Sequence, residues 1–213
     1  HIKGILSTLN PSIHNIAEVH IWAPLHLLSQ LEDKKWLIKH SPQKINKSIF
    51  WQLLWQLLEF KHELLESKCD LLFKTTTSSV TNFSPSIALS QDMLPFEPKE
   101  MKRFGWTIGR LRLVLLRLIY QKVINHSSGV IFLTEYASQR IQETMGPIEN
   151  TIVIPHGVDN IFRKEKYLNS NCFPSNDVKC IYVSAAAPYK HQWKVLEAIS
   201  ILRNKNINIS ITF

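Results

Sequence analysis

Short apolar runs alternate along the whole chain with segments whose apolar residues recur at helical spacing. Runs of this length favour strands. Strands that alternate with helices are typical of an α/β fold with a largely parallel sheet. The predicted strands are Val19–Trp22, Trp36–Ile38, Leu71–Phe73, Ile87–Leu89, Val130–Leu133, Ile152–Ile154, Ile181–Val183 and Ile207–Phe213.

The clearest helical pattern lies between the second and third of these strands. Trp51 and Trp55 give this segment a second apolar face. We therefore expect the helix to be buried between a sheet and a neighbouring helix. The residues that follow the i, i+3, i+4, i+7 rule are Phe50, Leu53, Leu54, Leu57, Leu58, Leu64 and Leu65.

Two strand–turn–helix units follow, one on each side of a polar, irregular stretch. In the first unit, Thr134 suits the N-cap of a helix that ends at Gly146. The second unit begins at Ile181, and the polar stretch between the two is Asn160–Lys179. We predict a first domain over residues 1–160, a linker over 161–179 and a second domain from 180 to 213, whose strand Ile181–Val183 lies in a separate sheet.

The composition is that of a globular protein. With 213 residues, 45% of them hydrophobic, the chain is long enough for one full domain and part of a second. It begins at His1 and ends in a strand pattern, so we expect it to lack the start of the first domain and to stop inside the second. Cys69, Cys172 and Cys180 match neither a disulfide framework nor a metal site, which predicts free thiols in the reducing cytoplasm.

The net charge of +8 favours an anionic partner: a phosphorylated ligand, a membrane surface or nucleic acid. Part of the excess lies in 101–122, where cations interleave with apolar residues as in a basic amphipathic helix. This helix either lies near an anionic membrane or packs in the domain with its arginines solvated. A nucleic-acid-binding protein is less well supported, because no known binding module or aromatic platform is present. The cations are Lys102, Arg103, Arg110, Arg112, Arg117 and Lys122.

Polar residues follow the predicted strands, and ligands of open parallel sheets bind beyond the carboxyl ends of strands. Lys190 lies near the start of a helix, where an anion is already favoured, and suits a phosphate; the alternative is a solvated lysine. Asp92 either binds an acceptor hydroxyl or caps the turn before Pro95. His156 is a general base, a ligand contact or a surface residue. Gly157 predicts a turn that needs a positive φ or a close approach.

Several segments resemble, in order, the family 4 retaining glycosyltransferases. Their acceptor-domain and donor-domain motifs are matched by Asp70–Phe73, Gln91–Phe96, Gly129–Thr134, Thr151–Asp159, Ile181–Ser184 and Pro188–Ala198. The resemblance implies the GT-B fold, with two facing Rossmann-like domains, the second only partly present. It also implies sugar transfer from a nucleotide-sugar to an acceptor hydroxyl, with retention. We expect a sugar or lipid-linked acceptor in polysaccharide or glycolipid synthesis, no metal or cofactor, and a cytoplasmic protein with peripheral contact at the inner face of the membrane.

The same resemblance assigns roles to the residues after the strands. The family's lysine that neutralises the departing diphosphate corresponds to Lys190. The other donor-side residues are Ser184, His191 and Gly157, and the acceptor-side cleft is formed by Gln91, Asp92, Thr134, Glu135 and His156.

The chain departs from the family pattern at three points. Ser184 and Ala185 stand where many members have Gly-Arg, so one cation of the diphosphate clamp is missing. Gln91 stands where many members have a histidine. The carboxylate pair of the donor domain would lie beyond Phe213, so we expect this chain alone to be inactive. A nucleotide-sugar epimerase or phosphorylase of the same architecture is the alternative enzyme.

Overall fold

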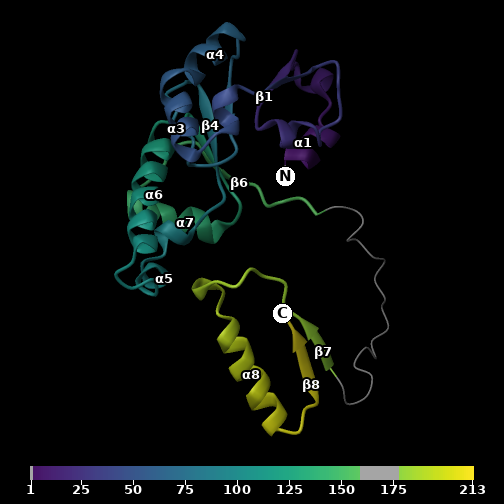
Figure 1. Ribbon diagram of the computed structural model, residues 1–213, viewed down its shortest axis with the longest axis vertical. Helices are drawn as coiled ribbons and strands as arrows, with labels where there is room; N and C mark the ends of the chain where they lie inside the picture. The colour runs from purple at the N-terminus through teal and green to yellow at the C-terminus, as the bar shows by residue number, and fades with distance from the viewer. Residues whose placement is uncertain (1, 159–177) are drawn as a thin grey trace. The chain divides into compact units, whose positions relative to one another are not determined.

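The computed structural model describes residues 2–158 and 178–213. The chain divides into two compact units, His1–Phe96 with Leu115–His156 and Glu97–Val114 with Gly157–Phe213. We describe each unit by itself (Figure 1). The fold is α/β, with a four-stranded parallel sheet flanked by helices in the first unit.

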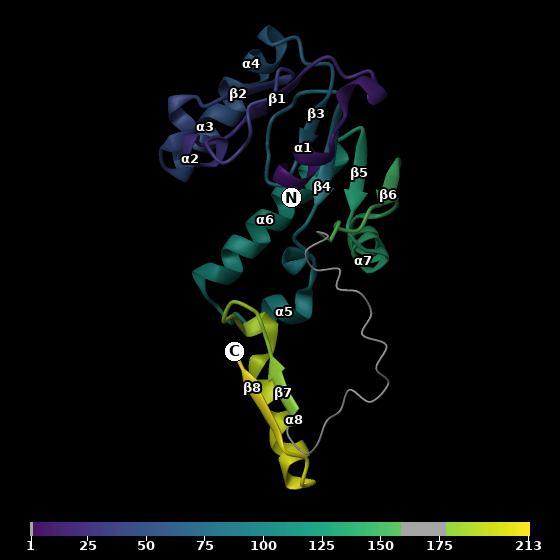
Figure 2. The ribbon, with the colours of Figure 1, turned by 90° about the vertical axis from the view of Figure 1, so that its right-hand side faces the viewer.

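The sheet of the first unit has the strand order β3-β4-β5-β6, and all neighbouring strands are parallel. Figure 2 shows the four strands side by side in this order. The predicted parallel strands around Val130 and Ile152 are confirmed as neighbours in one sheet. The strands are β3 (Leu72–Lys74), β4 (Ser86–Ser90), β5 (Gly129–Phe132) and β6 (Thr151–Val153).

A buried cluster joins this sheet to helices α6 (Ile108–Asn125) and α7 (Glu135–Met145). Phe132 and Ile141 are completely buried in it. The helix α7 ends at Gly146, as its sequence predicts, and its N-cap is Thr134. The sequence pattern around β5 and α7 therefore gives both the elements and their packing.

A second parallel pair, β1 (Val19–Trp22) with β2 (Leu37–His40), lies in the same unit. A second buried cluster includes Trp55, Phe60, Leu64 and Leu72. The remaining elements before β4 are α1 (Ile2–Thr8), η1 (Pro11–His14), α2 (Leu25–Leu28), η2 (Gln43–Asn46), α3 (Ile49–Leu58) and α4 (Phe60–Glu66).

The helix predicted over 50–65 is two helices, α3 and α4, which meet at Glu59. Its predicted burial on two sides is wrong. Trp55 is buried, whereas Phe50, Leu57 and Leu58 are each at least 60% exposed. Only one side of α3 packs against the second buried cluster, so hydrophobic spacing alone overstated how much of the helix is covered.

The basic segment predicted as one helix over 101–122 is also interrupted. The short helix α5 (Pro98–Lys102) ends before Gly105, and α6 begins at Ile108. Gly105 has a φ of +58°, which a glycine adopts without steric cost. The turn η3 (Leu94–Phe96) precedes α5. No helix in the described ranges 2–158 and 178–213 is both long and apolar enough to cross a membrane.

The second unit holds the parallel pair β7 (Val178–Ile181) and β8 (Ile209–Thr212), which forms a separate sheet as predicted. The turn η5 (Pro188–Lys190) and helix α8 (Gln192–Asn204) connect the two strands. The strand β7 begins and ends before the strand predicted over Ile181–Val183. Val178 and Lys179, the last two residues of the predicted linker, therefore belong to β7. Residues 161–177 of that linker, with Cys172, lie outside the described residues; Cys69 and Cys180 are free thiols.

Candidate functional site

The acceptor-side residues predicted from the sequence follow three neighbouring strands of one sheet. Gln91 and Asp92 follow β4, Thr134 and Glu135 follow β5, and His156 lies shortly after β6. Because these strands are parallel, their carboxyl ends share one edge of the sheet. The topology therefore brings all five residues to the same edge.

Asp92 is held by two hydrogen bonds within the fold. Its Oδ1 atom accepts from the backbone N–H of Leu94 at 3.1 Å, and its Oδ2 atom accepts from the hydroxyl of Tyr120 at 3.4 Å. The first contact confirms that Asp92 caps the turn before Pro95. The residue is nevertheless exposed.

Gln91 and Thr134 also make hydrogen bonds to the backbone. The Gln91 amide donates to the carbonyl of Thr75 at 2.8 Å, which ties the residue after β3 to the residue after β4. The Thr134 hydroxyl accepts from the N–H of Ala137 at 3.1 Å, the N-cap contact expected from the sequence. These two residues shape the sheet edge whether or not they touch a ligand.

Glu135 occupies the first turn of α7 and is exposed. A carboxylate there is favoured by the positive end of the helix dipole. Within the described residues it has no hydrogen-bond or ion-pair partner. Its carboxylate is therefore available at the sheet edge.

His156 and Gly157 are both exposed, and the expectation for Gly157 is corrected. Its φ lies outside the left-handed region, and a Cβ added to it would meet no atom within 4 Å. Neither a positive φ nor a close approach requires a glycine there.

In the second unit, the candidate Lys190 ends the turn η5, two residues before α8 begins. Its side chain is exposed, and its Nζ atom lies 5.1 Å from the centroid of the Tyr189 ring. The Tyr182 hydroxyl donates to the Lys190 carbonyl at 2.7 Å and fixes this end of the loop. Within the described residues, the ammonium has no carboxylate partner and remains open to an anion.

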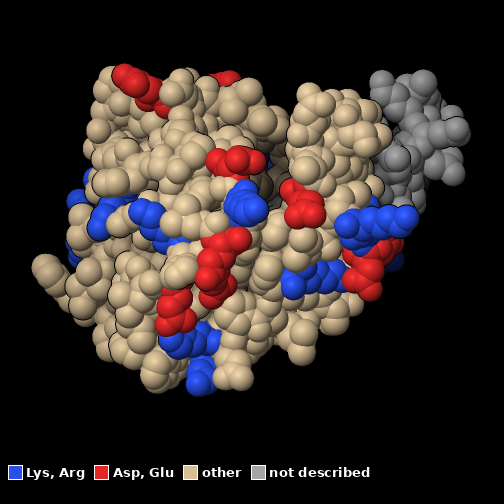
Figure 3. All heavy atoms as spheres, turned by 90° about the horizontal axis from the view of Figure 1, so that it is seen from above, with Lys and Arg blue, Asp and Glu red and all other residues tan. Residues whose placement is uncertain are grey.

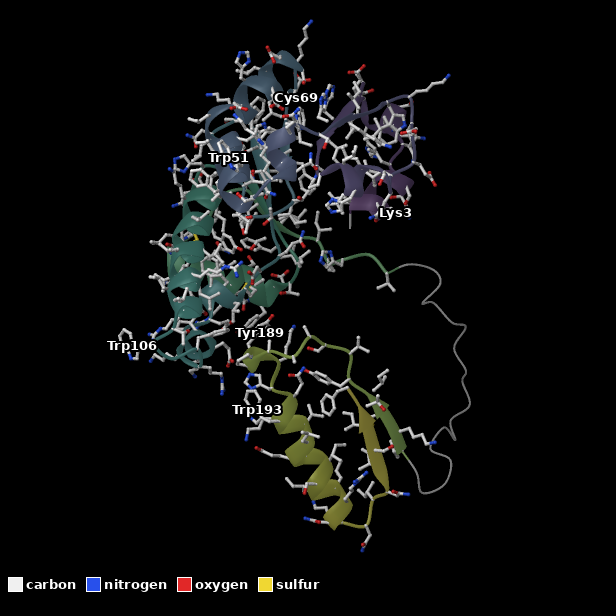
Figure 4. All side chains as sticks on the ribbon, in the orientation of Figure 1. Lys3, Trp51, Cys69, Trp106, Tyr189 and Trp193 are labelled. Carbon is white, nitrogen blue, oxygen red and sulfur yellow. The ribbon has the colours of Figure 1, made fainter. Side chains whose placement is uncertain are left out.

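The other two donor-side residues have defined contacts. The Ser184 hydroxyl donates to the carbonyl of Ala185 at 3.0 Å. His191 is the N-cap of α8 with a φ of 54°, and its side chain makes no capping bond. Its Nε2 atom lies 3.2 Å from Glu100 Oε2 in the same unit. Figure 4 shows Tyr189 and Trp193 at this end of α8.

Lys74, the last residue of β3, was not predicted from the sequence. Its side chain is only 3% exposed, and burial lowers the pKa of its amine. The predicted strand ended at Phe73, which left Lys74 in a loop. Side chains alternate between the two faces of a strand, so a strand that continued to residue 74 would have Leu72 and Lys74 on the same face. This spacing could have indicated that Lys74 is buried.

A cluster of histidines and tryptophans was also missed. His20 Nδ1 and His40 Nε2 are 2.9 Å apart, and the His40 ring stacks on Trp22 with a centroid distance of 4.4 Å. The carboxylate of Glu63 accepts from the indoles of Trp22 and Trp55 at 2.8 and 2.6 Å. Burial lowers the pKa of His40, and the neighbouring His20 lowers it further against the opposing effect of Glu63. The sequence feature that could have indicated this cluster is the i, i+2 spacing of His20 and Trp22, which places both side chains on one face of a strand.

No protein-family model and no curated protein matches this chain. Within the described part, no group of three or more His, Cys, Asp or Glu side chains is arranged to hold a metal ion. What the fold defines is an α/β protein with polar and charged residues at the carboxyl edge of a parallel sheet and a separate strand–loop–helix unit that carries an exposed lysine.

Proposed function

We propose that this protein is a retaining glycosyltransferase of the GT-B fold, which moves a sugar from a nucleotide-sugar to an acceptor hydroxyl in polysaccharide or glycolipid synthesis. The observation that carries the proposal is the loop after β7, where Lys190 has an exposed ammonium beside the start of α8. Helix N-termini attract phosphate through their unpaired N–H groups and dipole. The ordered resemblance of the flanking segments to family 4 enzymes supports the same assignment.

In this mechanism Lys190 stabilises the charge that builds on the leaving diphosphate. The bond between the sugar and the diphosphate breaks, and the acceptor oxygen bonds to the sugar on the same face. The proton of the acceptor hydroxyl passes to the leaving diphosphate oxygen. A cation already placed at the departing phosphate lowers the barrier because the charge develops only in the transition state. Ser184 and His191 lie on the same loop and would contact the donor. Gln91, Asp92, Thr134, Glu135 and His156 would line the acceptor side.

The test is the substitution Lys190→Ala in the full-length enzyme, with Lys194→Ala as the matched control. Lys194 is an exposed lysine of α8 that is paired with Glu197 at 2.6 Å. Loss of a charge-assisted contact to the diphosphate should cost about 2 to 4 kcal/mol in the transition state, a roughly thirtyfold to thousandfold drop in transfer rate. Binding of nucleoside diphosphates, measured by calorimetry, should weaken in the same variant. Transfer within about threefold of wild type in a folded Lys190→Ala protein rejects the assignment.

We further propose peripheral contact with an anionic membrane at the cytoplasmic side, made by α6. One side of α6 is buried through Leu113, Tyr120 and Ile124. The opposite side is exposed and apolar, with Leu111, Leu115 and Leu118 between 52% and 60% exposed. At 100° per residue, Arg110 and Arg117 fall at one border of this apolar side and Arg112 at the other.

That arrangement suits a helix lying in a membrane interface, because apolar residues enter the lipid while arginines meet the head groups. Trp106, in the loop before α6, is 97% exposed and projects from the ribbon (Figure 4). On the face shown in Figure 3, lysines and arginines are interspersed with acidic residues.

Vesicle binding tests this second part. The protein should bind anionic vesicles more strongly than neutral ones, and salt should weaken the binding. Replacing Leu111 and Leu118 together by Ser should weaken it several-fold, whereas Leu25→Ser, at an equally exposed leucine of α2, should not. Equal partition of the wild type to both vesicle types would reject the membrane contact.

A further inference from the structure

Helix α3 points its polar side chains inward and most of its apolar side chains outward. Its only polar residues are Gln52 and Gln56, and it carries no charge. The Gln52 amide donates to the carbonyl of Ile45 at 2.9 Å, and Gln56 Oε1 accepts from the N–H of Val80 at 3.2 Å. A helix that faces water has the opposite arrangement, with its polar residues outside. The reversal indicates that the outer side of α3 is covered by an apolar neighbour.

The outer apolar side continues from α3 onto α4, and we call it the α3–α4 patch. At 100° per residue, Phe50 and Leu57 fall on the side of α3 away from both glutamines. Leu58, the last residue of α3, and Leu65 of α4 line one open depression. The members of the patch, each between 39% and 72% exposed, are Ile49, Phe50, Leu53, Leu57, Leu58 and Leu65.

The α3–α4 patch has the size of a protein interface. The exposed fractions of its members correspond to roughly 700 Å² of surface, close to the ~800 Å² that one partner buries in a standard interface. The largest apolar patch on a typical monomer is about 300 to 600 Å². The patch is therefore large enough to hold a protein partner.

The charged residues beside the patch suit a second copy of the same chain. Lys61 and Glu66 line the depression with Leu58 and Leu65, and both charged residues are exposed. Lys61 has no ion-pair partner among the described residues, and Glu66 pairs with His62 at 3.6 Å. When two identical helices pack in parallel about a two-fold axis, a residue on one flank lies beside the residue five positions later in the other helix, and leucines seven positions apart pack between them. Lys61 and Glu66 have the first spacing, and the two leucines have the second.

We propose that the α3–α4 patch is the interface of a homodimer in which the two α4 helices run parallel. Lys61 of each copy pairs with Glu66 of the other, so the two-fold symmetry makes this contact twice. Leu58 and Leu65 pack between these ion pairs, and the outer residues of α3 extend the apolar contact. The proposal does not depend on the proposed transferase function.

An anionic membrane fits this patch less well than a second copy. The Glu66 side chain is 68% exposed beside the leucines, and α3 has no lysine or arginine. Anionic head groups repel a carboxylate, whereas they attract arginines such as those that border the apolar side of α6. The charges thus assign the two apolar surfaces to different partners.

The experiment measures the mass of the full-length protein in solution by sedimentation equilibrium over a range of concentrations. We expect the wild type to dimerise. Replacing Phe50 and Leu57 together by Ser should raise the Kd of the dimer at least about tenfold, because it removes apolar contact area from the interface. Leu25→Ser, at a leucine of α2 that is 66% exposed, should leave the Kd unchanged.

Charge reversal tests the pairing itself. Lys61→Glu and Glu66→Lys should each weaken self-association at least about tenfold, because like charges then meet across the axis. A one-to-one mixture of the two variants should form a heterodimer within about threefold of the wild-type Kd, since both ion pairs are restored with reversed sign. Both positions are exposed, so both variants should fold, which circular dichroism checks.

Two results would overturn the proposal. One is a wild-type protein that stays monomeric at the highest concentration, including the case in which the Phe50 and Leu57 double variant loses binding to vesicles instead. The other is a mixture of the charge variants that associates no better than either variant alone, which would show that Lys61 and Glu66 do not meet across a two-fold axis.

Discussion

The two strand–turn–helix units of this protein have the same sequence pattern but differ in how they are stabilised. In the first, β5 lies inside a four-stranded sheet, and Phe132 and Ile141 are completely buried beside it. In the second, β7 pairs with one strand among the described residues, and within 178–213 only Ile209 is buried. Leu196 and Ile201 of α8 are more than half exposed. Apolar spacing thus defines a helix, whereas burial depends on how many layers surround it.

The helix caps differ in the same way. The Thr134 hydroxyl caps α7, whereas the N-cap of α8 is His191, which has a left-handed backbone and makes no side-chain capping bond. The first unit uses its polar loop residues to satisfy the backbone. The second leaves Lys190 exposed beside the helix start, with no carboxylate partner in the described residues. A residue without a structural role is the better candidate for a ligand contact, and this difference favours Lys190 over Thr134 as a functional residue.

The largest expected effect is on stability, and it compares the two helices directly. Ile141→Ala should destabilise the protein by about 2 to 5 kcal/mol, because it removes buried methylenes and leaves a cavity. Ile201→Ala, at an isoleucine 56% exposed, should change the free energy of unfolding by less than about 0.5 kcal/mol. Urea unfolding of both variants measures the difference. Similar losses in the two would mean that α8 is packed as tightly as α7.

A smaller effect is expected at the cap of α7. Thr134→Ala should cost about 1 kcal/mol in the free energy of unfolding, since it leaves the N–H of Ala137 without its partner. Thr134→Ser keeps the hydroxyl and should recover most of the loss. Nucleoside diphosphate binding should stay unchanged in both variants. If Thr134→Ala instead impairs sugar transfer without loss of stability, Thr134 contacts the acceptor and the contrast with Lys190 fails.

The smallest effect concerns the histidine pair on β1 and β2. Because the folded-state pKa of His40 is lowered, the unfolded chain binds more protons between that value and the ordinary one. The stability contributed by the neutral ring is present above the ordinary pKa and is lost as pH falls through this window. Urea unfolding at pH 5 and pH 7.5 should show a smaller difference in His40→Gln than in wild type. The matched variant His14→Gln, at an exposed histidine, should keep the wild-type difference.

Local patterns predicted most of the elements and some of their contacts. The strands around Val130 and Ile152 and the Thr134 cap are where the sequence indicates, because strand formation and capping depend on residues within a few positions. The two roles weighed for Asp92 could not be separated from the sequence. The turn contact is made with Leu94, whereas the second contact, with Tyr120, comes from a residue 28 positions away.

By itself, the sequence determined the α/β class, the order of the strands and the positions of Lys190 and the predicted acceptor-side residues after their strands. The tertiary structure decided which of these elements are covered. It exposed Phe50 and Leu58 despite their apolar pattern and buried Lys74, a lysine, at a strand end. The physical reason is that periodicity reports the faces of one element, whereas burial depends on distant segments that pack over it.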